Sequence, residues 1–139
     1  MKTEPRASWV RIVIACMLGA PALAHDAQPT GAEVVKVVSA QKLPNVPGQS
    51  LTAVTVDVPP GDVSSPHHHA GFVFVYVLVG PVDSKLNDEP SKRYATGESW
   101  VEPPGTLHAS MSNPSKTETA RILAVFVAPD GAELTRITQ

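Results

Sequence analysis

An uninterrupted apolar run between two glycines commits the middle of this chain to β structure. The run, Phe72–Val79, reads FVFVYVLV and lies between Gly71 and Gly80. Its β-branched and aromatic residues favour a strand, and its length is typical of a strand rather than a helix. Because the run is apolar at every position, we expect both of its faces to be covered, as in a central strand of a sandwich or barrel.

The chain beyond residue 32 has the same all-β character. Short runs of Val, Ile, Thr and Phe alternate with Pro, Gly, Asn and Asp, and helical periodicity is almost absent. We therefore expect one all-β domain over residues 33–139. Its predicted strands are Glu33–Ser39, Leu51–Val58, Phe72–Val79, Val82–Leu86, Lys92–Ala95, Ser99–Val101, His108–Ser112, Arg121–Val127 and Glu133–Ile137.

The first residues have the pattern of a secretory signal peptide. Three basic residues precede Ile12–Ala24, which is apolar or small throughout and ends in an A-x-A cleavage pattern. This segment is shorter than the about 20 residues that a membrane-spanning helix needs. We expect residues 1–24 to be a signal peptide, residues 25–32 to form a flexible leader, and the protein to be periplasmic or secreted.

Charge and cysteine content exclude several kinds of site. The chain has a formal net charge of −2 and no basic cluster, which argues against nucleic-acid binding and against stable membrane association after signal cleavage. Its single cysteine, Cys16, lies inside the predicted signal peptide. The mature chain would therefore offer no disulfide, thiol nucleophile or thiolate metal ligand.

Three consecutive histidines, His67–His69, stand just before the apolar run. Side chains at i and i+2 of a strand share a face, so His67 and His69 could bind one ion while His68 points away. A bulge near Gly71 could turn His68 inward as an extra ligand or an acid/base group. A solvated histidine cluster at a strand edge is the alternative interpretation.

A second segment makes the metal interpretation more specific. The first segment has Gly61, then His67-x-His69 after five residues, and Gly80; the second has Gly97, Pro103, Gly105 and His108, with Asn113 close behind. Together they resemble the two motifs of the cupin superfamily and are similar to its small single-domain members. This resemblance implies a cupin β-barrel, or double-stranded β-helix jelly roll, and a homodimer. It also implies a divalent metal (iron, manganese, zinc, nickel or copper) held by His67, His69 and His108.

One position departs from the cupin pattern. Val73 stands where the first motif normally has a glutamate. The three histidines could suffice with water in the remaining positions, or a residue outside the motifs could complete the site, or the barrel could have lost its metal. The candidates for that completing residue are Glu98, Glu102 and Gln49.

Further residues are candidates for the surroundings of the site. Val73, Val75, Tyr76, Trp100 and Met111 are candidate pocket-lining residues, although such side chains are more often simply core. Glu102 is a possible extra ligand or acid/base group. For both Glu98 and Glu102, however, the favoured interpretation is a carboxylate exposed to solvent.

Three functions remain open at this point. The first is a metal-dependent cupin that acts on a small organic molecule, with dioxygenase chemistry at a three-histidine iron as the leading case. The second is a non-catalytic barrel that binds a metal or a small ligand. The third is a metal-free, isomerase- or lyase-like cupin, which needs a positioned base that the sequence does not reveal. The catalytic residues are not assigned, and the fold alone does not choose among these functions.

Overall fold

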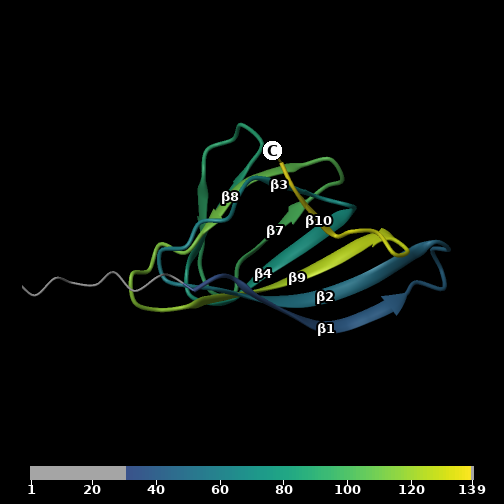
Figure 1. Cartoon of the computed structure of the whole chain (residues 1–139), viewed down its shortest axis with the longest axis horizontal. Coiled ribbons are helices and arrows are strands. Elements are labelled where there is room, and N and C mark those ends of the chain that lie inside the picture. The colour runs from purple at the N-terminus through teal and green to yellow at the C-terminus, as the bar shows by residue number, and fades with distance from the viewer. Residues whose placement is uncertain (1–30, 139) are drawn as a thin grey trace, which may run out of the picture.

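The computed structural model describes residues 31–138, and these form two five-stranded antiparallel sheets without a helix (Figure 1). The predicted all-β architecture is confirmed. In chain order the strands are β1 (Val34–Lys42), β2 (Gln49–Val58), β3 (His67–His69), β4 (Phe72–Val79), β5 (Val82–Leu86), β6 (Lys92–Tyr94), β7 (Ser99–Glu102), β8 (Leu107–Ser112), β9 (Ala120–Pro129) and β10 (Thr135–Ile137).

The first sheet has the order β1-β2-β9-β4-β7 and is the long layer at the bottom of Figure 1. In β4, Val73, Val75 and Val77 are buried on the inner face. The expectation that both faces of this strand are covered is wrong for the single chain. Phe72, Phe74 and Tyr76 point outward and are 36–38 % exposed. A strand that is apolar at every position is thus covered on one side only.

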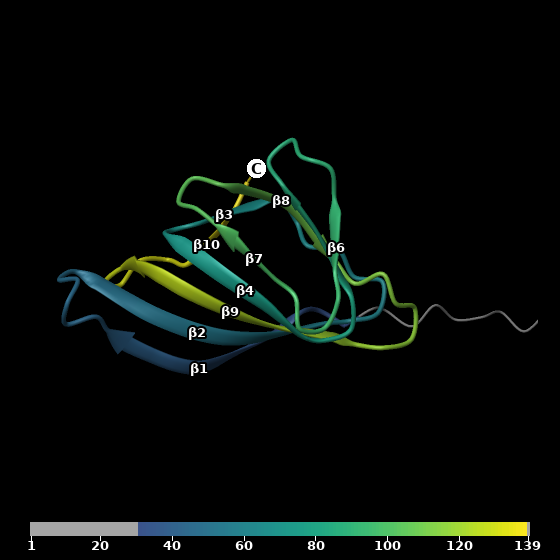
Figure 2. The ribbon, with the colours of Figure 1, turned by 180° about the vertical axis from the view of Figure 1, so that it is seen from behind.

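The second sheet has the order β10-β3-β8-β5-β6 and lies across the first, as the view from behind shows (Figure 2). The histidine triplet is strand β3, which pairs with β8 on one side and β10 on the other. The strands expected from apolar patterning did not include it, because three histidines have no apolar signal. Pairing on both edges supplies the backbone hydrogen bonds that hold the triplet extended.

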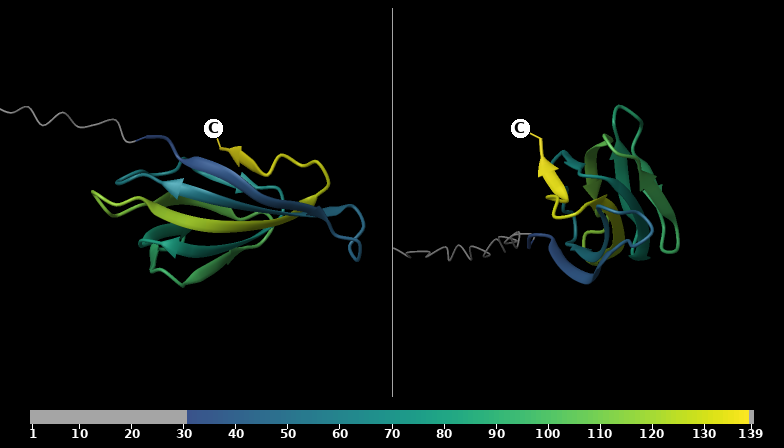
Figure 3. Two further views of the ribbon diagram at one scale, coloured as in Figure 1. Left: turned by 90° about the horizontal axis from the view of Figure 1, so that it is seen from below. Right: turned by 90° about the vertical axis from the view of Figure 1, so that its right-hand side faces the viewer.

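The hydrophobic core lies between the two sheets, and the right-hand view of Figure 3 looks along the long axis of the molecule. It consists largely of valines from the inner face of the first sheet, together with larger side chains from both sheets. Its larger members are Tyr94, Trp100, Met111, Ile122 and Phe126. This small-residue core leaves room for a cavity beside the histidines.

Two glycines fix the turns on either side of β4. A Cβ atom at Gly71 would lie 2.1 Å from the carbonyl oxygen of Val127, so any larger residue would collide with the backbone of β9. Gly80 has φ of 89° and packs against Ala120, a left-handed conformation that favours glycine. Both glycines therefore set the path of the chain from the histidine strand through β4.

Within residues 31–138, no helix is long and apolar enough to cross a membrane. The predicted signal peptide, with Cys16, and residues 25–30 of the predicted leader lie outside the described residues.

Candidate metal centre

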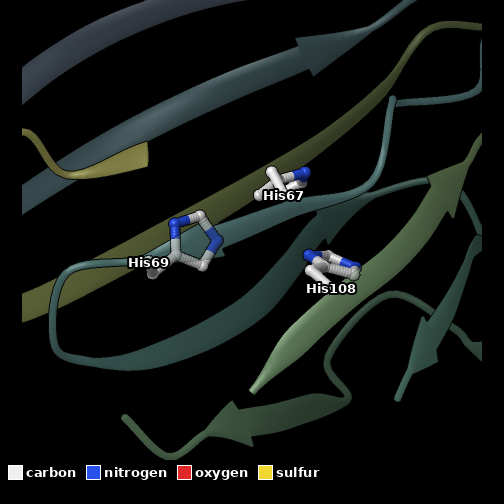
Figure 4. A group of neighbouring side chains, drawn as sticks. All are labelled: His67, His69 and His108. Carbon is white, nitrogen blue, oxygen red and sulfur yellow. The ribbon is translucent and has the colours of Figure 1, made fainter. Parts of the chain in front are cut away.

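Three imidazole rings gather on the inner face of the second sheet (Figure 4). His67 and His69 project from β3 and His108 from β8, and His67 is the direct cross-strand partner of His108. The ring centroid of His67 lies 4.8 Å from that of His69 and 4.9 Å from that of His108. One ligand nitrogen from each ring lies within 4.8 Å of the others. The structure thus brings together the three residues predicted as ligands.

Backbone carbonyls orient the two rings of β3. The Nδ1 of His67 donates to the carbonyl of Ser65 at 2.8 Å, and the Nδ1 of His69 donates to the carbonyl of Leu134 at 3.1 Å. A carbonyl can only accept, so the proton is on Nδ1 and the lone pair is on Nε2. Metal-binding histidines commonly donate such a hydrogen bond from the ring nitrogen that does not bind the metal.

His108 is held from the other side of the cluster. Its Nε2 shares a hydrogen bond of 3.0 Å with the hydroxyl of Ser84, which is itself buried on β5. Its Nδ1 lies 3.2 Å from Oε1 of Glu102. The ring is therefore fixed by a neutral partner on one nitrogen and faces the site with the other.

Burial keeps these rings in the form that binds a metal. Desolvation lowers the pKa of His69 to about 4 and that of His108 to about 3, with nearby histidines adding to the effect. Both imidazoles are consequently neutral near pH 7, and a neutral imidazole is the metal-binding form.

A buried carboxylate lies beside the three rings. Glu102, the last residue of β7, is 1 % exposed, so the prediction that it is solvated is wrong. Oε1 accepts a hydrogen bond of 2.9 Å from Nε1 of Trp100, and Oε2 lies 3.6 Å from Nε2 of His69. Desolvation raises the pKa of Glu102. Three imidazoles and one carboxylate are a donor set that suits a divalent first-row metal.

The cluster lines a cavity of about 280 Å³ between the two sheets. Its walls are mostly apolar and include four of the candidate lining residues, Val73, Val75, Trp100 and Met111. Val35 of β1 and Ile137 of β10 also line it and are about 60 % exposed, so the cavity opens between these two edge strands.

Several candidates lie elsewhere. His68 is exposed and its Nδ1 donates to the carbonyl of Thr106, so no bulge turns it toward the other rings. Tyr76 is on the outer face of β4 and does not line the cavity. Glu98 is exposed and accepts a hydrogen bond from the backbone of Ala95. Gln49 begins β2 opposite Pro129 and is likewise absent from the lining.

Among the lining residues that the sequence reasoning missed, Phe126 and Glu33 lie closest to the chemistry of the site. Phe126 of β9 makes an edge-on contact with His69, with ring centroids 5.2 Å apart. Glu33 lines the cavity just before β1 and is partly buried, and desolvation followed by the charge of Asp62 raises its pKa. Neither has a local signal, since both come near the histidines only through the pairing of distant strands.

Comparison with known protein families agrees with the resemblance. A family model described as the cupin domain matches residues 54–126, which is more than half of the chain. Among curated proteins no match is found.

Solved structures share the fold. A conserved protein with a double-stranded β-helix domain from Klebsiella pneumoniae has a TM-score of 0.61 and 19 % identity over 81 % of this chain and 90 % of that one. DMSP lyase DddQ from Ruegeria pomeroyi has a TM-score of 0.55 and 20 % identity, and the match covers 63 % of this chain and 43 % of the lyase. Oxalate decarboxylase from Bacillus subtilis has a TM-score of 0.55 and 24 % identity, and the match covers 65 % of this chain and 24 % of the decarboxylase. This chain thus spans under half of either enzyme, and identities this low show the fold alone.

Proposed function

Because this chain belongs to the cupin family, we propose that it is a metal-dependent enzyme that oxidises a small, largely apolar organic molecule with O₂. The observation that carries the proposal is the convergence of His67, His69 and His108 at the wall of an apolar cavity. A bound iron ion would supply the Lewis acidity and redox chemistry that such an oxidation needs.

The residues of this chain hold and shield that centre. The carbonyls of Ser65 and Leu134 keep both β3 rings turned toward the centre. The apolar walls exclude water and strengthen every electrostatic interaction inside the cavity. Edge strands β1 and β10 flank the route by which a ligand would enter.

The lining residues favour a neutral, apolar substrate. None of the described residues that line the cavity is Lys or Arg, so no protein cation is available to pair with a substrate carboxylate. Two of them, Glu33 and Glu102, are acidic. A volume of about 280 Å³ and walls of Val, Ile, Trp, Met and Phe suit a compact molecule with apolar groups.

Lyase chemistry is the second candidate, and Glu102 is the observation that favours it. Its buried carboxyl has a raised pKa and lies in the cavity, which is the setting of a general base. The sequence named Glu102 as a possible acid/base group without showing that it is buried. The fold is shared with a DMSP lyase and an oxalate decarboxylase, so elimination or decarboxylation is the alternative reaction class.

We further propose that the protein acts in the periplasm or outside the cell as a homodimer. The basic and apolar pattern of residues 1–24 supports export. The exposed aromatic side chains of β4 support a protein interface on the outer face of the first sheet.

Two measurements test the enzymatic proposal. Elemental analysis of the purified protein should find near-stoichiometric divalent metal, and the double variant His67→Ala/His108→Ala should lose it. If both proteins hold equally little metal, the metal-dependent function is lost. Oxygen uptake with the metal-loaded protein and a panel of diketones, phenolics and thiols then separates the reactions. Substrate consumed without oxygen uptake would favour the lyase, and tight binding without turnover would favour a non-catalytic binding barrel.

A further inference from the structure

The first cupin motif normally has a glutamate at the position of Val73, and this chain has a buried valine there. Val73 is fully buried and lines the cavity beside the histidines. A valine offers no ligand atom, so any carboxylate in the site must come from another strand.

The register of the first sheet supplies that carboxylate. Val73 of β4 is paired directly with Glu102 of β7 in an antiparallel ladder. Residues directly opposite in such a ladder project from the same face, with Cβ atoms about 5 Å apart. The side chain of Glu102 therefore reaches the cavity from the position beside Val73, one strand over.

The two oxygens of Glu102 have different surroundings. Oε1 accepts the hydrogen bond from Nε1 of Trp100 and lies 3.2 Å from Nδ1 of His108. Oε2 is buried and has no hydrogen-bond partner among the residues that the structure describes. This oxygen lies 3.6 Å from Nε2 of His69, the nitrogen whose lone pair is free.

Such an arrangement is costly unless a cation is present. A buried carboxylate oxygen without a partner carries a large desolvation penalty. The described residues that line the cavity include no Lys or Arg that could pair with this oxygen. A divalent cation among the three imidazoles would satisfy Oε2 and offset the penalty.

We propose that Glu102 is the fourth protein ligand of the metal, so that the acidic ligand of this cupin comes from β7 instead of β4. The proposal rests on the metal site of the proposed function. It gives a site of three neutral donors and one anion, which lowers the net charge of a divalent centre from +2 to +1.

Cobalt binding to the metal-free protein tests this directly. Wild type, Glu102→Gln and Glu98→Gln are titrated with Co²⁺ and followed by the visible absorption of the bound ion. Glu102→Gln keeps the side-chain shape and an acceptor for Trp100 but removes the anionic donor. We expect it to lose at least about 10-fold in affinity and to change the absorption spectrum, since even indirect partners of metal ligands are worth that much. Glu98→Gln removes the same charge from the exposed residue before β7 and should match wild type.

Thermal unfolding of the same proteins separates a lost ligand from a damaged fold. Without metal, Glu102→Gln should unfold at the same temperature as wild type or higher, because it removes a buried, unpaired carboxylate. With saturating Co²⁺ its gain in Tm should be smaller than that of wild type. Equal Co²⁺ affinity and spectra for wild type and Glu102→Gln would overturn the proposal.

Moving the carboxylate back to β4 gives a second test. Glu102→Val should bind Co²⁺ as weakly as Glu102→Gln, and adding Val73→Glu should restore at least about 10-fold of the affinity. No recovery in a folded double variant would contradict the equivalence of the two positions. Loss of metal from His67→Ala/His108→Ala with unchanged binding in Glu102→Gln would leave the metal function intact and refute only this inference.

Discussion

His67 and His108 are direct cross-strand partners in the second sheet, although β3 and β8 lie far apart in the sequence. Their ring centroids are 4.9 Å apart, and a third ring, that of His69, lies two residues along β3. The backbone ladder thus places donors from two motifs at one point. A metal bound there would link β3 to β8 in addition to their short pairing.

Metal should accordingly stabilise the folded protein. At a free concentration 100 times its Kd, a ligand that binds only the folded state adds about 2.7 kcal/mol. For a domain of this size we expect Tm to rise by about 10 °C when Co²⁺ is added to the metal-free protein. Differential scanning calorimetry measures the shift. His67→Ala/His108→Ala should show none, and an unchanged wild-type Tm at saturating Co²⁺ would contradict a site formed on folding.

The metal-free protein should be sensitive to acid. Burial lowers the pKa of His69 to about 4 and of His108 to about 3 from a usual 6.5. Between pH 6.5 and about 3 the unfolded chain therefore binds protons that the folded chain excludes, and stability falls as pH falls. Glu102 and Glu33 oppose this trend, because burial raises the pKa of each carboxyl and the folded chain holds those protons to higher pH. The pKa values of the two rings are lowered far enough that we expect acid destabilisation as the net effect.

The measurement is Tm of the metal-free protein from pH 7 to pH 5, with an expected fall of at least about 5 °C. His108→Gln should flatten the curve, because the most strongly shifted ring is gone. The matched control is His68→Gln, which removes an exposed ring from the opposite face of β3 and should leave the slope unchanged. A flat wild-type curve would show that the two rings are not desolvated as described.

Gly71 should not tolerate a side chain. A Cβ atom there would lie 2.1 Å from the carbonyl oxygen of Val127 and 2.9 Å from Cα of Ala128, so β4 and β9 would have to separate. Forcing atoms into packed structure costs about 1–3 kcal/mol. We expect Gly71→Ala to lower Tm by about 10 °C and to weaken Co²⁺ binding, since Gly71 is two residues from His69. Gly31→Ala, in open space, is the control, and equal Tm values would refute the clash.

The sequence was sufficient to predict that the three imidazoles lie together, but it did not single out Glu102 from the other candidate carboxylates. Spacing of two residues on an extended segment places His67 and His69 on one face, and the second motif adds His108. Glu102 could not be assigned in the same way, because its proximity to Val73 depends on the pairing register of β4 with β7. A glutamate at the end of a short strand has the local pattern of a solvated residue.

The outer face of the first sheet shows a second limit of sequence patterns. A run that is apolar at every position indicates a strand but does not say what covers each face. In the single chain the inner face of β4 packs in the core, whereas Phe72, Phe74 and Tyr76 remain exposed. What covers them is a question of assembly and not of the chain's own packing.

The exposed aromatic residues of β4 lead to a prediction about the oligomeric state of the protein. Phe74 lies between Val101 of β7 and Val125 of β9 in the ladder, with Phe72 and Tyr76 on either side along β4. A contiguous apolar face of this kind is typical of an interface, and two copies could bury it symmetrically. We expect light scattering to give twice the chain mass for wild type and the chain mass for Phe74→Glu, because a charge at the centre of the patch would be buried unpaired. Val63→Glu is the matched control, since Val63 is 61 % exposed outside this sheet and should leave the dimer intact. A dimer that survives Phe74→Glu would exclude this face as its interface, and a monomeric wild type would refute the homodimer.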